Sequence, residues 1–142
     1  MSTEFERLYA GRLYGLVSWK QLEAFWDRLD PGAGWFLYAV GEAPPAAPSS
    51  GEDARRFMTR VHDLLREEHR EDYCGIVFAD DLERPSMVKI YDPNNLGVSC
   101  GFSKNPPLPG WIMSRVPPVD LKPHAPTPGN RRRWWQGLFG SD

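Results

Sequence analysis

Several features that often identify a protein's function are scarce in this chain of 142 residues. It holds two cysteines and three histidines, too few for a disulfide scaffold. No run of about 18 apolar residues is present, so no conventional membrane-spanning helix is expected. The glycines do not follow the spacing of a Walker or dinucleotide-binding motif. We therefore expect no nucleotide site, no cofactor and no metal.

A strong net charge is also absent. The formal net charge is −2, with 25% charged residues, so no general electrostatic attraction to nucleic acid is indicated. The charge is nevertheless unevenly placed. Residues 129–142 carry three arginines and one aspartate, whereas the remainder holds 14 basic and 18 acidic residues, net −4. An acidic body is thus joined to a basic C-terminal segment.

The first ten residues, MSTEFERLYA, carry acids where a secretory signal would have a basic and then an apolar region. The low cysteine count is compatible with reduced thiols. We expect a cytoplasmic protein.

Hydrophobic periodicity predicts three helices. Ser18 and Gln21 have the spacing of a capping box, and apolar residues then recur at helical spacing until the sequence DPG at residues 30–32. Ser49 or Ser50 begins a longer helix that extends to about residue 70. A shorter helix is expected within residues 4–14.

Four strands are predicted, at residues 35–40, 74–79, 87–91 and 111–116. The second and third are joined by a short polar segment, which favours an antiparallel hairpin. The sequence therefore predicts an α+β fold, with a small mainly antiparallel sheet and helices packed on one face. One core should contain Leu22, Phe25, Trp26, Leu29, Phe36, Phe57, Val61, Leu64, Ile76, Phe78, Val88 and Ile90.

The domain organisation follows from the prolines. At 142 residues and 41% hydrophobic content, the chain suits one globular domain, expected at residues 1–116. Repeated prolines predict an extended linker over residues 117–130. A basic and aromatic tail occupies residues 131–142.

Metal-ligating residue types occur without metal-binding spacing. His62 and His69 lie seven residues apart, roughly 10 Å along a helix axis, where a shared metal favours a spacing of four. Cys74, Cys100 and His124 do not complete a short ligand motif. We interpret the two helical histidines as surface residues and Cys74 as a small core residue.

Cys100, in the sequence GVSCGFS, is the one candidate nucleophile. Small neighbours leave room for attack, and Gly101 could supply a backbone N–H as an oxyanion donor. The sequence does not identify a general base that would activate this thiol. The acids Asp80, Asp81 and Glu83, and the DPNN sequence at residues 92–95, are interpreted as turn-forming residues.

The C-terminal sequence RRRWWQGLFG combines three arginines with four large apolar residues. Two glycines make an autonomous helix unfavourable, so the segment should gain structure only by docking. Three surfaces come into question: its own domain, another protein, or a membrane interface as the least favoured. The predicted partner-binding residues are Arg131, Arg132, Arg133, Trp134, Trp135, Leu138 and Phe139.

These patterns predict a small non-enzymatic accessory or adaptor protein that binds another protein or a larger protein assembly. The C-terminal arginine and tryptophan segment would be its recognition element. No nucleic-acid partner is expected, and peripheral membrane contact is the less favoured alternative. The alternative function is a small thiol-dependent enzyme or redox protein centred on Cys100.

Overall fold

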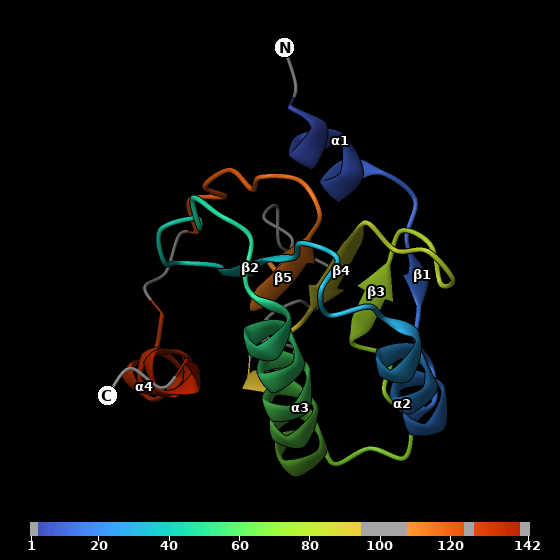
Figure 1. The fold of residues 1–142 in the computed structure, drawn as a ribbon. Coiled ribbons are helices and arrows are strands. Elements are labelled where there is room, and N and C mark those ends of the chain that lie inside the picture. Colours follow the sequence, from blue (N-terminus) through green and yellow to red (C-terminus); the bar gives the residue numbers. More distant parts are fainter. Residues whose placement is uncertain (1–2, 95–107, 124–126, 140–142) are drawn as a thin grey trace, which may run out of the picture.

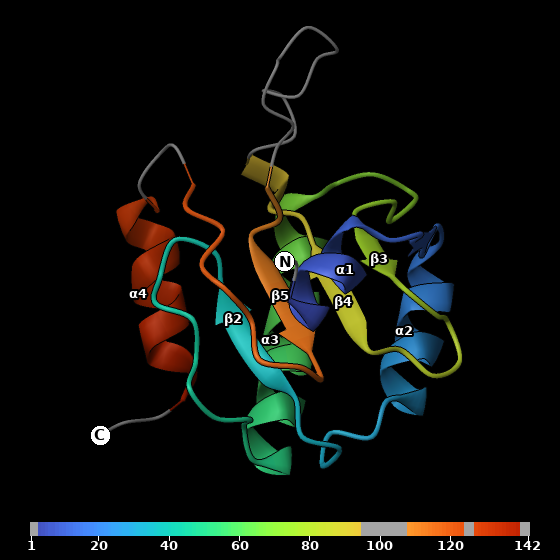
Figure 2. The ribbon, with the colours of Figure 1, turned by 90° about the horizontal axis from the view of Figure 1, so that it is seen from above.

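Five short strands form one antiparallel sheet in the computed structural model, which describes residues 3–94, 108–123 and 127–139 (Figure 1). The order across the sheet is β1, β3, β4, β5, β2. Figure 2 shows the strands from above, with the short helix α1 lying over them. The predicted α+β fold with a small antiparallel sheet is confirmed. The strands are β1 (Tyr14–Gly15), β2 (Phe36–Ala39), β3 (Val77–Ala79), β4 (Met87–Ile90) and β5 (Trp111–Ser114).

Four helices accompany the sheet in the described part of the chain: α1 (Glu4–Ala10), α2 (Trp19–Arg28), α3 (Gly51–Glu68) and α4 (Gly129–Leu138). None of them is long and apolar enough to cross a membrane. The predicted hairpin is present, because β3 and β4 pair antiparallel. The sequence did not predict β1, which pairs with β3 at the edge of the sheet.

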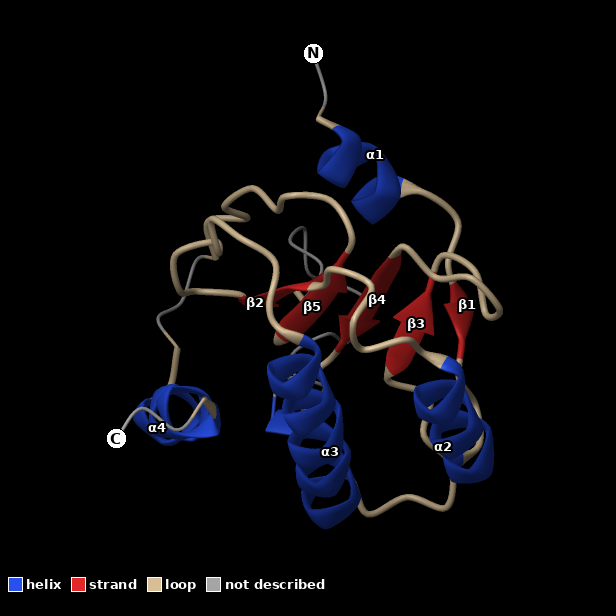
Figure 3. Ribbon diagram, viewed as in Figure 1, coloured by secondary structure: helices blue, strands red, loops and turns tan. Residues whose placement is uncertain are grey.

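Two helices cover one face of the sheet and α1 covers the other (Figure 3). Alternation along the strands directs every second side chain to each face. The face toward α2 and α3 carries Leu37, Ala39, Val77, Ala79, Val88, Ile90, Trp111 and Met113, which belong to the main core. The expected packing on one face therefore describes α2 and α3, while α1 adds a second layer.

Serine caps begin the two helices that form the main core. The Ser18 hydroxyl accepts a hydrogen bond from the Gln21 N–H, and the Ser50 hydroxyl accepts one from the Asp53 N–H. The predicted capping box is only half formed, because the Gln21 side chain accepts from the Val17 N–H instead of Ser18. These caps satisfy N–H groups that a helix leaves free in its first turn.

The opposite face holds a smaller apolar cluster of Phe5, Tyr38, Met87 and Ile112. The segment that follows β5 closes over it, and the Leu121 N–H donates to the Tyr38 hydroxyl at 3.0 Å. The prediction that Phe36 and Phe78 share the main core is wrong. Strand register places both on the α1 face, beside Ser114 and Lys89 respectively. Each is one position out of phase with the strand residues that face α2 and α3.

Residues 117–123 and 127–128 have neither helix nor strand. Helix α4 begins at Gly129, within the predicted linker, and flanks the sheet beyond β2 (Figure 2). Its start contacts the end of α3 through Arg131 and Glu68, and its end contacts an early turn of α3 through Leu138 and Arg56. The C-terminal segment thus packs on its own domain.

Candidate functional site

The predicted recognition segment forms most of α4. Its seven predicted partner-binding residues differ in how deeply they are buried. Arg131 and Leu138 are buried, at 5% and 2% exposure. Trp134, Trp135 and Phe139 are half-buried. The exposed residues Arg132, Arg133, Gln136 and Gly137 form what we term the outer face of α4. Of the three docking surfaces considered from the sequence, its own domain is the one that α4 contacts here.

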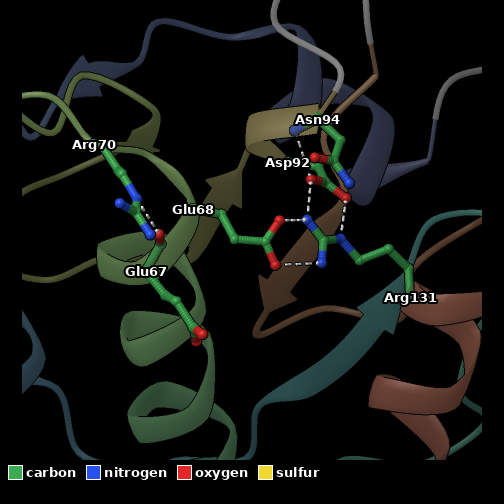
Figure 4. Close-up of polar contacts among 6 residues, drawn as sticks. All are labelled: Glu67, Glu68, Arg70, Asp92, Asn94 and Arg131. Carbon is green, nitrogen blue, oxygen red and sulfur yellow. Dashed lines mark hydrogen bonds and ion pairs between the residues drawn. The ribbon is translucent and has the colours of Figure 1, made fainter.

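Arg131 is the main polar contact between α4 and the domain (Figure 4). Its guanidinium donates to both Glu68 carboxylate oxygens, from Nη1 at 2.9 Å and from Nη2 at 2.6 Å. It also donates to both Asp92 oxygens, from Nε at 2.8 Å and from Nη2 at 3.0 Å. Two bidentate pairs therefore satisfy one guanidinium, in the planar geometry that arginine favours with carboxylates.

Electrostatics support this arrangement. The hydrogen bonds from Arg131 hold the pKa of Glu68 below its usual value. The same bonds to Glu68, reinforced by those to Asp92, raise the pKa of Arg131 further above its already high value. Both groups are charged at neutral pH. One buried cation thus serves two carboxylates, of which Asp92 is buried and Glu68 is 36% exposed, so the loss of Arg131 would leave both without a counter-charge.

Asp92 has two roles, of which the sequence predicted one. Its Oδ1 accepts from the Asn94 N–H at 2.9 Å, as expected of a turn-forming aspartate. Its pairing with Arg131 was not predicted, because the partner lies 39 residues away. Gly110 allows the close approach on the other side, since a Cβ atom there would lie 3.1 Å from the Asp92 Cβ.

Aromatic contacts hold the remainder of α4. The Trp134 ring lies 5.1 Å from that of Trp111 in β5, and the Trp135 ring lies 6.1 Å from that of Phe57 in α3. Phe139 packs edge-on against Trp135. At the end of the helix, Arg56 Nη1 donates to the Leu138 carbonyl at 3.4 Å. This contact satisfies one of the carbonyls that a helix leaves free at its C-terminus.

The outer face of α4 is basic. Arg132 is 49% exposed in its side chain and forms a long ion pair of 3.6 Å with Glu42. Arg133 is exposed on the next helical position. Surface ion pairs of this kind contribute little to stability. Breaking the ion pair between Arg132 and Glu42 would therefore cost little.

The two cysteines and the histidines considered with them do not form a site in the described residues. Cys100 and His124 lie outside the described residues. Cys74 is buried, as predicted, and burial raises the pKa of its thiol. The His69 ring nitrogen Nε2 lies 2.9 Å from the Cys74 carbonyl oxygen. The backbone of Cys74, rather than its sulfur, is thus in contact with histidine.

His62 of α3 and His69, which caps its C-terminus, are packing residues more than surface residues. Both rings lie edge-on to Trp19, at centroid distances of 6.2 and 6.0 Å. His62 Nδ1 also accepts from the Trp26 indole N–H at 3.3 Å. Burial lowers the pKa of His62, so its neutral form is favoured. Within the described ranges, no three His, Cys, Asp or Glu side chains are grouped to hold a metal ion.

The acidic hairpin residues form turns, as predicted. Asp80 Oδ1 accepts from the Ser86 and Met87 N–H groups. Asp81 Oδ1 accepts from the Glu83 and Arg84 N–H groups, and these bonds lower the pKa of Asp81. Their carboxylates are therefore occupied by the local backbone.

Cys74 should resist alkylation in the native protein. Only the thiolate reacts, and a buried thiol with a raised pKa is neither ionised near pH 7 nor accessible. Mass spectrometry after brief iodoacetamide treatment should show no label on the Cys100→Ala protein. One label should then appear after unfolding in urea. Rapid native labelling of Cys74 would contradict its buried position.

Comparisons with known proteins do not assign the chain to a family. No protein-family model matches it, and neither a curated protein nor a solved structure does so.

Proposed function

We propose that this chain is a small non-enzymatic accessory or adaptor protein that binds a larger protein assembly, with α4 as its recognition element. The observation that carries the proposal is the two-sided character of α4. Arg131 and Leu138 fix one face in the domain, while Arg132 and Arg133 project from the other. A helix held in this way presents its arginines in fixed positions, which reduces the ordering cost of binding.

The roles of the recognition residues differ from those expected for a free tail. In a free tail the aromatic residues would be the anchors, but here Trp134 and Trp135 pack against Trp111 and Phe57. The arginines of the outer face then make the first contact. The half-buried tryptophan edges can add apolar area at the margins of that contact.

The partner's chemistry follows from that outer face. Guanidinium groups pair best with carboxylates, so an acidic protein surface is the expected partner. A membrane interface is less favoured, because the aromatic side chains that would enter the headgroup layer are turned toward the domain. A protein partner therefore suits the docked helix better.

Charge reversal on the outer face should weaken binding strongly. The Arg132→Glu/Arg133→Glu protein should capture the partner at least about tenfold less well than the wild-type chain, mainly through slower association. The matched control is Arg12→Glu/Arg84→Glu, whose arginines are exposed near the opposite edge of the sheet. Affinity capture from extract, followed by surface plasmon resonance with the captured protein, measures the difference.

The control should bind as the wild-type chain does. Added salt should weaken binding by the control and by the wild-type chain alike. Equal binding by the charge-reversed chain and the control would refute α4 as the recognition element. The Cys100→Ala protein should also keep its partner. Loss of binding in that variant alone would instead favour the thiol-centred alternative.

A further inference from the structure

The free edge of the sheet carries exposed apolar side chains that the proposed function does not use. β1 is the end strand, at the right of the sheet in Figure 1, and no described strand pairs with its outer side. In the described part of the chain, the large apolar side chains that are exposed are those of Tyr14, Val17 and Tyr73. Tyr14 lies in β1, and Tyr73 forms a β-bridge with Ser18, next to Val17. These three side chains, which we term the edge patch, therefore gather along one edge.

The backbone of this edge offers hydrogen-bonding groups at Gly15. Leu16 directs its own groups toward the sheet, because its N–H donates to the Val77 carbonyl at 2.9 Å and its carbonyl accepts from the Gly75 N–H at 3.0 Å. This direction alternates along a strand, so the N–H and the carbonyl of Gly15 point away from the sheet. Gly15 has no side chain to obstruct them. Such groups form a template on which another extended segment can pair.

A hollow of about 410 Å³ adjoins the edge patch. It lies between Trp19, at the start of α2, and the end of α3, from which Arg66 and Arg70 line it. The Arg66 guanidinium lies 4.8 Å from the centre of the Trp19 ring, where a cation–π contact holds it. The His69 ring, which also lines the hollow, contacts the Tyr73 ring at 6.1 Å. The hollow and the edge patch are therefore one continuous surface.

The two guanidinium groups of the hollow have no carboxylate partner in the described ranges. Neither Arg66 nor Arg70 forms an ion pair there. Arg70 Nε donates to the Glu67 carbonyl at 3.2 Å, and Figure 4 shows the Glu67 carboxylate directed away from that guanidinium. Glu71 and Asp72 also line the hollow, and their charges repel a run of acids. The hollow therefore suits a single acidic side chain.

We propose that this edge binds an extended segment of a partner protein, in which one carboxylate side chain stands beside apolar ones. The segment pairs with Gly15 as a further strand, and its apolar side chains cover the edge patch. Its carboxylate enters the hollow and pairs with Arg66 and Arg70. Trp19 follows Gly15 by four residues, roughly 13 Å at 3.3 Å per extended residue. A short segment therefore spans both parts of the surface, at the end of the sheet opposite to β2 and α4.

A second copy of this chain fits the edge less well. β1 has two residues, and the Val17 N–H beyond it is already bonded to the Gln21 side chain at 3.0 Å. Two copies would therefore pair only around Gly15, whereas a stable interface buries roughly 1,200–2,000 Å². Residues 13–18 also hold no carboxylate for the hollow of the other copy. A separate segment supplies that charge.

A phage-displayed library of random short peptides tests the proposal with the full chain. The library is first depleted on the Val17→Lys protein, in which a charge blocks the edge, and is then selected on the wild-type chain. Enriched peptides should alternate apolar residues and carry one Asp or Glu. A synthetic peptide of this sequence should shift the Gly15 and Val17 amides and the Trp19 indole N–H in NMR spectra, and leave the α4 amides unchanged.

Two matched comparisons test the chemistry. Replacing the peptide's acidic residue by its amide should weaken binding to the wild-type chain at least about tenfold. The same change should have little effect on binding to the Arg66→Gln/Arg70→Gln protein. The Ala24→Lys protein, which gains its charge at an exposed position of α2, should bind the peptide as the wild-type chain does.

Three results would overturn the proposal. One is that no peptide is enriched on the wild-type chain over the Val17→Lys protein. Another is that the enriched peptides shift α4 amides and not those of the edge. The third is a free wild-type chain that sediments as a dimer and becomes a monomer on Val17→Lys, which would assign the edge to a second copy. None of these results bears on partner binding by the outer face of α4.

Discussion

Replacing Arg131 with methionine should lower the free energy of unfolding by about 3–5 kcal/mol. The guanidinium bonds both oxygens of Glu68 and both of Asp92, and the Asp92 side chain is only 6% exposed. Without Arg131, the buried Asp92 carboxylate faces the partly exposed Glu68 carboxylate with no cation to compensate either. Urea unfolding at neutral pH, followed by tryptophan fluorescence, measures the loss.

The neighbouring Arg132→Met variant is the matched control. It removes the same charge from the same helix, but its ion pair with Glu42 is long and half-exposed. Its cost should be under about 1 kcal/mol. Equal losses in the free energy of unfolding for the two substitutions would mean that the buried ion pairs of Arg131 add no stability beyond that of a surface ion pair.

Acid should distinguish the wild-type chain from the Arg131→Met variant as well. Arg131 lowers the pKa of Glu68 below its ordinary value of 4.5. A depressed carboxylate pKa contributes stability that is present above the ordinary value and lost as the pH falls through the lowered one. The wild-type chain should therefore lose this contribution below about pH 4.5. The Arg131→Met chain, which lacks it at neutral pH, should show a shallower decline.

Replacing Phe57 with alanine should cost about 3–5 kcal/mol. Phe57 lies fully buried in α3 and meets Trp135 of α4 edge-on. The substitution removes core volume and also a contact that holds α4 in place. Thermal and urea unfolding should both report the loss, which is a large fraction of the stability of a typical domain.

Phe78→Ala provides the comparison for Phe57, since the same atoms are removed. Phe78 is half-buried on the α1 face, where it packs against Tyr91. Its loss should be clearly smaller. A larger effect at Phe78 than at Phe57 would contradict the assignment of the main core to the α2 and α3 face.

The helices and strands of the domain could be predicted because their signals are local. Ser18 and Ser50 begin helices through bonds that span three residues, and apolar runs bounded by glycine or proline give strands. The two-residue strand β1 has no such pattern. The errors at Phe36 and Phe78 have a different cause. In a sheet covered on both faces, apolar side chains point both ways, so composition does not reveal the face.

The site was predicted only in part. The arginine and tryptophan composition singled out the segment that forms α4 as the candidate, and the expectation that it needs a docking surface followed from its glycines. The sequence did not predict that Arg131 is buried whereas Arg132 and Arg133 are exposed. This difference depends on Glu68 and Asp92, which lie 63 and 39 residues away, and no local pattern encodes such pairings. The hydrogen bond from the Lys89 amine in β4 to the Tyr9 carbonyl in α1 was missed for the same reason, since it spans 80 residues.

Hydrogen exchange of the α4 amides in the intact chain tests the central claim most directly. If Arg131 and Leu138 hold this helix on the domain, its hydrogen-bonded amides from residue 133 onward should be protected well above an unstructured peptide. The Arg131→Met substitution should remove most of that protection and leave the amides of α3 protected. Exchange of the wild-type α4 amides at the rate of a free peptide would contradict the account.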